Sequence, residues 1–295
     1  MNTATAPLRV AASPLAYARD LVLLSKPRLS GLVVLTCAGG LALAPGEIGV
    51  ARAILSVLGT AAVVGAANAL NSFVERDVDG LMRRTRDRPL PAGRVEPMVA
   101  LALGVAVPVF AIPVLALVAN PLTALLAFVA LVTYVLVYTP MKRRSTLALF
   151  VGAIPGAIPP LMGWTAVTGR LDPGGVALFA LLFAWQLPHF LAISLYLAED
   201  YARGGLVVFS LVHGERTTRA WIAATSVALF PVPLVLAALG VATPAAAGVA
   251  AALGAGLAAY ALAGVGKTGG RWARSFFLAT LAYLPLAFAA LLALR

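Results

Sequence analysis

Three oxygen-bearing side chains, Asn71, Glu75 and Asp79, follow one another at intervals of four residues near the end of a long apolar stretch. On an α-helix this interval brings side chains to one face, about one turn apart. Carboxylate and amide oxygens are the ligands that Mg²⁺ prefers in proteins, and arginines pair well with phosphate oxygens. The arginines of this segment are Arg76, Arg83, Arg84, Arg86 and Arg88. The segment therefore predicts a magnesium-assisted site for a lipid diphosphate.

Two neighbours complete this first candidate site. Asn68 lies three residues before Asn71 and is expected on the same side of the helix, whereas Asp77 is expected to face elsewhere. The alternative interpretation is a solvated loop of alternating charges. We favour the functional one, because acids and amides at the edge of a membrane are costly and usually serve function.

A second candidate site lies between residues 185 and 205, where helical spacing places His189, Tyr196 and Asp200 near one face. Glu199 and Asp200 end an apolar stretch, and acids at a helix C-terminus oppose its dipole, so helix stability does not explain them. Two acidic clusters could share one diphosphate through two Mg²⁺ ions. The simpler alternatives are acids that end a helix in water and, for His189, a buried core histidine rather than a metal ligand or base.

A third group runs from Tyr138 to Ser145 and contains Lys142 and Arg143. These cations are expected either to contact phosphate or to mark the cytoplasmic side of the membrane, and the residues alone leave both interpretations open.

The composition excludes a soluble domain: of 295 residues, 61% are hydrophobic and only 11% are charged. Long apolar segments indicate an all-α polytopic membrane protein, and 27 glycines suit close helix packing in lipid. The lone cysteine, Cys37, cannot form an intrachain disulfide and is expected to serve packing. The nine predicted spans are 29–45, 50–74, 97–117, 121–140, 146–168, 174–197, 220–240, 242–265 and 273–294.

The cations support this count of spans. With nine spans, 19 of the 22 lysines and arginines fall on one side, and only Arg52, Arg170 and Arg295 fall on the other. Positive charge gathers on the cytoplasmic side, so we expect a multi-pass protein of the cytoplasmic (inner) membrane with a cytoplasmic N-terminus. Residues 1–28 are predicted to form a cytoplasmic segment with an interfacial helix, and residues 29–295 a single transmembrane domain. Nucleic acid is not an expected partner, because the basic residues lie in short loops beside the membrane.

Taken in order, these segments resemble the UbiA-type intramembrane prenyltransferases, and within them the branch that farnesylates protohaem IX. The first site resembles the superfamily's Asn-x-x-x-acid-x-x-x-Asp motif, and MRRTRDRPL after it resembles the branch's M-x-R-T-x-x-R-P-L. Further motifs of that branch are matched by KPR, YTPMKR, GAIPPLMGW and the segment around PHF and EDY. The resemblance runs from about residue 26 to residue 220 and is specific through the ordered set.

The resemblance implies a nine-helix bundle around a membrane-open cavity. It implies transfer of a farnesyl group from farnesyl diphosphate to a vinyl group of haem b, with addition of water, to give haem O. It also implies the lipid bilayer as surroundings and a downstream haem-modifying or oxidase-assembly protein as a partner. The implied Mg²⁺ ligands are Asn71, Glu75, Asp79 and Asp200; Lys142 and Arg143 join them as catalytic residues; and substrate would be bound by Asn68, Arg83, Arg86, Arg88, Tyr138, His189, Tyr196 and Glu199.

The chain departs from the family pattern at three places. After Tyr201 it reads ARGGLVVF, where the branch usually has A-G-x-P-M-x-P. Glu75 stands where the superfamily often has aspartate, and Gly204 stands where an acid often follows Asp200 by four residues. Two rival functions follow from the same features. One is an aromatic prenyltransferase for quinone precursors, and the other, of a different class, is a transporter that uses polar helix ends as a gate.

Overall fold

The computed structural model describes residues 13–294, and this range is helical without strands. Residues 1–12 of the predicted cytoplasmic segment, and Arg295, lie outside the described residues. The helices are α1 (Pro14–Leu24), α2 (Pro27–Leu43), α3 (Val50–Leu81), α4 (Pro97–Val118), α5 (Pro121–Val132), the π-helical segment η1 (Thr133–Tyr138), α6 (Thr139–Met141), α7 (Ala148–Thr168), α8 (Pro173–Tyr196), α9 (Ala198–Arg203), α10 (Phe209–Ser226), the 3₁₀ turn η2 (Val227–Leu229), α11 (Pro231–Ala238), α12 (Pro244–Leu262) and α13 (Gly270–Ala293).

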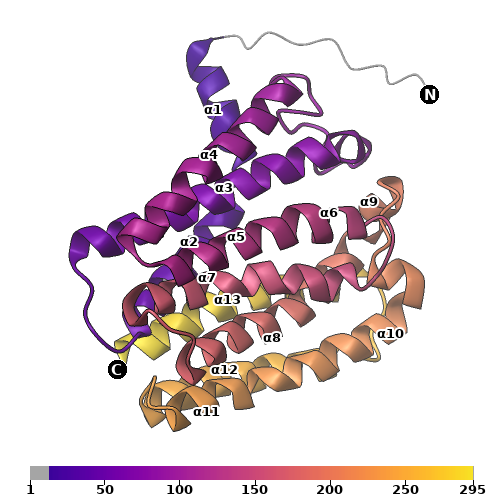
Figure 1. The fold of residues 1–295 in the computed structure, drawn as a ribbon. Helices are drawn as coiled ribbons and strands as arrows, with labels where there is room; N and C mark the ends of the chain where they lie inside the picture. The colour runs from indigo at the N-terminus through magenta and orange to yellow at the C-terminus, as the bar shows by residue number, and fades with distance from the viewer. Residues whose placement is uncertain (1–12, 295) are drawn as a thin grey trace.

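The long helices form a bundle in which successive spans run in opposite directions (Figure 1). Within the described range, eight helices or continuous helix runs are long and apolar enough to cross a membrane, and the pair α1 and α2, bent by 52°, makes a ninth. The predicted count of nine is consistent with this, because α5, η1 and α6 join into one span and α10, η2 and α11 into another.

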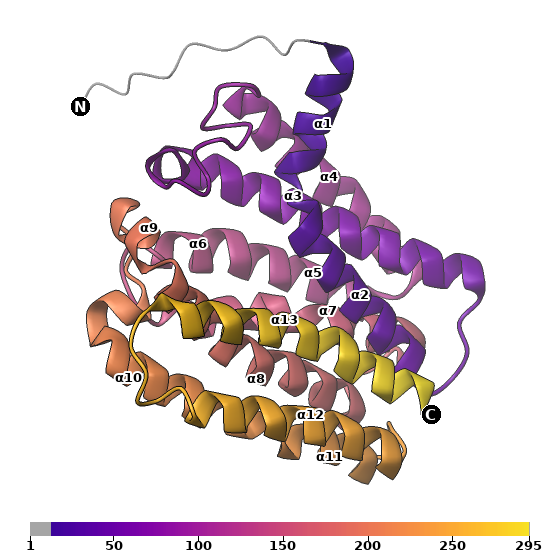
Figure 2. The same ribbon diagram turned by 180° about the vertical axis from the view of Figure 1, so that it is seen from behind.

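The connections after α3, α6, α8 and α12 lie together at one end of the bundle, while the C-terminus lies at the other (Figures 1 and 2). These are the connections in which the cations gather. The bundle therefore presents one basic end, as the charge partition predicts.

Two helices extend beyond the predicted spans. α3 continues to Leu81, seven residues past the predicted end, and carries the first candidate site as one unbroken helix. α10 begins at Phe209 rather than near residue 220, and Gly214 interrupts it with a φ of 78°. Hydropathy misses this start because His213, Glu215 and Arg216 are polar and exposed.

Glycines allow α2 and α7 to pack backbone against backbone. A Cβ atom on Gly40 would collide with the carbonyl oxygen of Pro160, and one on Gly163 would collide with that of Cys37. Lipid chains are as apolar as the side chains they replace, so helix association in a bilayer depends on such close contact. Because α2 carries residues that line the site described below, this contact also fixes one wall of the site.

We expect Gly40→Ala to lower the stability of the detergent-solubilised protein by about 1–3 kcal/mol, because the added methyl group has no room. Gly31→Ala on the same helix is the matched control, since a Cβ atom there meets nothing within 4 Å and alanine is the better helix former. Thermal unfolding of the two variants measures the difference. Equal stability of both would contradict the packing described for α2 and α7.

Candidate active site

The first candidate site forms on one face of α3, as predicted. Asn71 donates from Nδ2 to the Glu75 carboxylate over 3.0 Å and to the Thr139 hydroxyl over 3.1 Å. Asp79 is buried one turn further along the helix, with 2% of its surface exposed. Asp77 lies on another face, with its side chain 75% exposed beside Arg76. The spacing of four thus places three oxygen-bearing side chains in one row.

Three basic side chains from three other parts of the chain contact this row. Lys26, between α1 and α2, donates to Asn71 Oδ1, and Lys142, just after α6, pairs with Glu75, each over 2.5 Å. Arg88 pairs with Asp79 over 2.7 Å. Burial alone lowers the pKa of Lys142, but the neighbouring Tyr138 and Glu75 outweigh this, so its pKa is raised above the ordinary value. Lys142 is therefore a cation at neutral pH.

The second acidic region contacts the backbone of the arginine-rich loop that follows the first. Asp200, on α9, accepts hydrogen bonds from the backbone N–H groups of Arg83 and Arg84 over 2.7 and 3.1 Å. It thereby holds the start of the arginine-rich loop against α9. Glu199 is exposed and pairs loosely with Arg203 over 3.7 Å.

The remaining predicted cations lie at the rim. Arg83, Arg86 and Arg143 are exposed, and Arg86 has a weak pair with Asp87 over 3.8 Å. The side chains of all three arginines are therefore accessible to solvent.

The donor set of this row suits magnesium. Asn71, Glu75 and Asp79 each carry a side-chain oxygen, and oxygen ligands match a hard divalent cation. In the described range, no three His, Cys, Asp or Glu side chains are gathered closely enough to form a metal cluster by themselves. Two carboxylates and an amide leave coordination positions for other oxygens, which agrees with the way Mg²⁺ binds through few protein ligands together with substrate phosphates.

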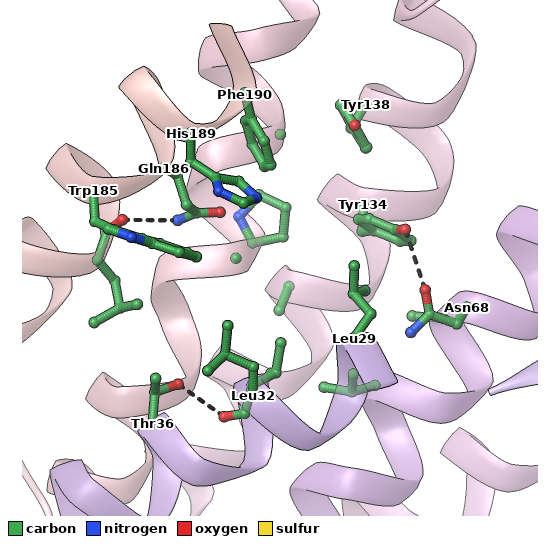
Figure 3. Close-up of a pocket in the computed structure, with 18 of the residues that line it drawn as sticks. Leu29, Leu32, Thr36, Asn68, Tyr134, Tyr138, Trp185, Gln186, His189 and Phe190 are labelled. Carbon is green, nitrogen blue, oxygen red and sulfur yellow. Dashed lines mark hydrogen bonds between the residues drawn. The ribbon is translucent and has the colours of Figure 1, made fainter. Parts of the chain in front are cut away.

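A cavity of about 260 Å³ opens beside the polar row (Figure 3). Asn68 connects the two: it lies three residues before Asn71 on α3 and lines the cavity, where its Oδ1 accepts from the Tyr134 hydroxyl over 3.3 Å. Tyr134 and Tyr138 lie on the π-helical segment η1, with ring centroids 5.4 Å apart, and both line the cavity. Most of the other lining residues are apolar.

The opposite wall of the cavity comes from α8 (Figure 3). The His189 ring stacks on Trp185 at 4.7 Å, and its Nδ1 lies 2.8 Å from the Thr280 hydroxyl on α13. Gln186 donates to the carbonyl oxygens of Ala153 and Leu182. His189 is therefore a cavity residue, held by its neighbours, and is not part of the polar row on α3.

The single helical face predicted for His189, Tyr196 and Asp200 is wrong in one respect. α8 ends at Tyr196, and the chain turns at Leu197, with φ −109° and ψ 22°, before α9 begins. Helical counting therefore does not carry over to Asp200. Tyr196 is 37% exposed and contacts Phe277, which also contacts His189.

The sequence prediction missed several residues of the site. In the sequence, Lys26 stands out only as part of the KPR motif. In the structure its side chain donates to Asn71, and its backbone is left-handed, with φ 51°. Tyr134 could have been found from its spacing of four before Tyr138. Thr280 gives no signal in the sequence, because it lies in an apolar span 91 residues after His189.

The chain is similar to known proteins in both sequence and fold. The sequence pattern of the UbiA prenyltransferase family matches residues 32–289. The chain is 74% identical to a protoheme IX farnesyltransferase of Anaeromyxobacter sp. (strain Fw109-5), over 99% of this chain and 98% of the relative. It is 68% identical to the protein of that name from Anaeromyxobacter dehalogenans (strain 2CP-C), over 99% of both chains. A UbiA homolog from Archaeoglobus fulgidus, solved with DMAPP and Mg²⁺, has the same fold, with a TM-score of 0.66 at 15% identity over 94% of this chain and 100% of that one.

Proposed function

Because the chain belongs to the UbiA prenyltransferase family, we propose that it transfers a farnesyl group from farnesyl diphosphate to a vinyl group of haem b and adds water, giving haem O. The observation that carries this proposal is whole-chain identity of 74% to a relative named for that reaction. The geometry supports it, since a row of acids and cations joins an apolar cavity through Asn68. The aromatic prenyltransferase and transporter alternatives are not favoured.

The diphosphate end supplies positive charge where the leaving group forms. The bond between farnesyl C1 and the diphosphate oxygen breaks, and its electron pair leaves with the diphosphate. Lys142 and Lys26 already face the acidic row, and Arg83, Arg86 and Arg143 can turn inward from the rim to stabilise the developing charge. Asn71, Glu75, Asp79 and Asp200 would hold Mg²⁺, which neutralises the diphosphate when bound. A fold neighbour solved with Mg²⁺ and a prenyl diphosphate supports this choice of metal.

The cavity protects the carbocations. Its apolar walls exclude water while the vinyl π electrons attack farnesyl C1, and the ring faces of Tyr134 and Tyr138 can stabilise the allylic charge. The attack forms a carbon–carbon bond and leaves a cation on the vinyl carbon next to the porphyrin. Water adds there and releases a proton, giving the hydroxyethylfarnesyl group. Arg28 also lines the cavity and offers a charge opposite to that of the haem propionates.

The test is a product assay. Purified protein is incubated with haem, farnesyl diphosphate and Mg²⁺, and the haem fraction is examined by mass spectrometry. We expect haem that has gained a farnesyl group and a hydroxyl group, with diphosphate released in equal amount. An aromatic quinone precursor prenylated in place of haem, or flux across vesicles without diphosphate release, would overturn the proposal.

We further propose that the basic end of the bundle faces the cytoplasm, that the protein lies in the inner membrane, and that the product passes to a downstream haem-modifying or oxidase-assembly protein. The charge partition supports the orientation. The chemistry of the product supports its delivery to a partner protein, because a farnesylated haem is too apolar to leave the bilayer freely.

Cysteine labelling tests the orientation. Gly80→Cys and Arg203→Cys lie at the basic end and Arg170→Cys at the other, and all three positions are exposed. We expect an impermeant thiol reagent to label the first two only from the cytoplasmic side, and Arg170→Cys only from outside. The native Cys37 is buried, so the unsubstituted protein gives the background. Labelling of Gly80→Cys from outside would contradict the orientation.

A further inference from the structure

Two hydrogen bonds meet at the hydroxyl group of Thr280. Its Oγ1 lies 2.6 Å from the carbonyl oxygen of Phe277, one turn earlier on α13, and 2.8 Å from His189 Nδ1. A hydroxyl group has one proton to donate, and a carbonyl oxygen cannot donate. Threonine in a helix commonly gives that proton to a carbonyl one turn back. The Thr280 oxygen therefore accepts from His189, which requires the proton on Nδ1.

The surroundings hold the imidazole ring in this position. Trp185 stacks on it at 4.7 Å and itself donates from Nε1 to the carbonyl oxygen of Thr280 over 2.7 Å, while Phe277 packs at 4.8 Å. One residue of α13 thus anchors two neighbouring rings of α8. No acidic side chain of the described residues pairs with His189, so a neutral imidazole is expected inside the bundle.

The second ring nitrogen is left without a protein partner. Among the described residues, none forms a hydrogen bond with His189 Nε2, and this atom is absent from the set of fully enclosed polar atoms without partners. Since His189 lines the cavity, Nε2 is open to it (Figure 3). In the Nδ1–H tautomer this atom carries a lone pair and no proton.

We propose that Thr280 is a positioning residue that fixes His189 in the Nδ1–H tautomer. An unprotonated Nε2 then faces the cavity, where its lone pair can bind the substrate that receives the prenyl group. The class of ligand that suits such a nitrogen is a metalloporphyrin iron, because neutral imidazole binds metals through the nitrogen without a proton. This inference rests on the proposed function for the identity of the acceptor, but the tautomer itself does not.

Nitrogen-15 NMR of labelled histidine tests the tautomer without any substrate. The chain has two histidines, and His213→Gln removes the exposed one, so His189 gives the only signals. We expect a protonated Nδ1 and an unprotonated Nε2. Thr280→Val keeps the shape of the side chain but removes the hydroxyl oxygen that accepts from Nδ1, so the proton should move to Nε2. Thr280→Ser keeps a hydroxyl group and should give the original signals. A protonated Nε2 before substitution, or unchanged signals in Thr280→Val, would overturn the inference.

Titration with ferric haem tests the use of the lone pair. Replacing the residue that orients a metal-binding histidine typically costs 10–100-fold in affinity, so we expect Thr280→Val to weaken haem binding at least about 10-fold and to change the Soret band as His189→Ala does. Farnesyl diphosphate binding should be unchanged in both. Equal loss of both affinities, with lower thermal stability, would assign Thr280 a merely structural role and overturn the proposal. Failure of the product assay alone would leave the tautomer result standing, so the two failures are distinguishable.

Discussion

Replacing Asp79 with asparagine is expected to lower kcat/KM for farnesyl diphosphate about a thousandfold. The change keeps the size of the side chain but removes a charge that is 2% exposed and pairs with Arg88 over 2.7 Å. Loss of a metal-bridged contact costs several kcal/mol in the transition state, and about 4 kcal/mol corresponds to a factor of about 10³. Steady-state rates at several Mg²⁺ concentrations measure the effect.

Asp77→Asn is the matched control for this variant. The two aspartates lie two residues apart on α3, but the Asp77 side chain is 75% exposed and faces away from the acidic row. We expect normal rates for Asp77→Asn at every Mg²⁺ concentration. A near-normal rate for Asp79→Asn at saturating Mg²⁺ would remove Asp79 from the metal site.

Replacing Asp200 with asparagine is expected to lower activity about a hundredfold. Both carboxylate oxygens accept backbone N–H groups, from Arg83 and Arg84, and an amide group can offer only one oxygen. Hydrogen bonds to a charged group contribute about 1.5–3 kcal/mol each, and about 2.7 kcal/mol corresponds to a hundredfold. Hydrogen exchange of residues 82–88 should increase, because the loop loses its attachment to α9.

Glu199→Gln controls for the loss of one acid at this position. Its side chain is 90% exposed beside Arg203, and we expect activity and hydrogen exchange to stay normal. The predicted role of Asp200 as a metal ligand has a separate readout, which is a rise in the Mg²⁺ concentration needed for half-maximal rate. Full activity of Asp200→Asn would contradict both roles of Asp200, as a metal ligand and as the attachment of the arginine-rich loop to α9.

Local rules explain what the sequence could predict about the site. Asn71, Glu75 and Asp79 were predicted on one face because the helical period alone decides this, and α3 is one unbroken helix. The span count followed from hydropathy in the same way. Both inferences need only residues close together in the sequence.

Tertiary contacts explain what the sequence could not predict. Lys26 meets Asn71 across 45 residues, and Thr280 meets His189 across 91. Nothing in the local pattern of an apolar span indicates which threonine will face which histidine. Asp200 was predicted as an acid of the site, but its hydrogen bonds to a distant backbone depend on how α9 and the arginine loop dock.

The π-helical turn of residues 133–138 shapes one wall of the cavity from within a span. A π-turn takes up one residue more than an α-turn, and the regular helix resumes on either side. Shortening this stretch by one residue would leave α5 in place against α7, but it would redraw the wall formed by Tyr134 and Tyr138. A single-residue insertion or deletion at this point would therefore change which side chains of this span line the cavity.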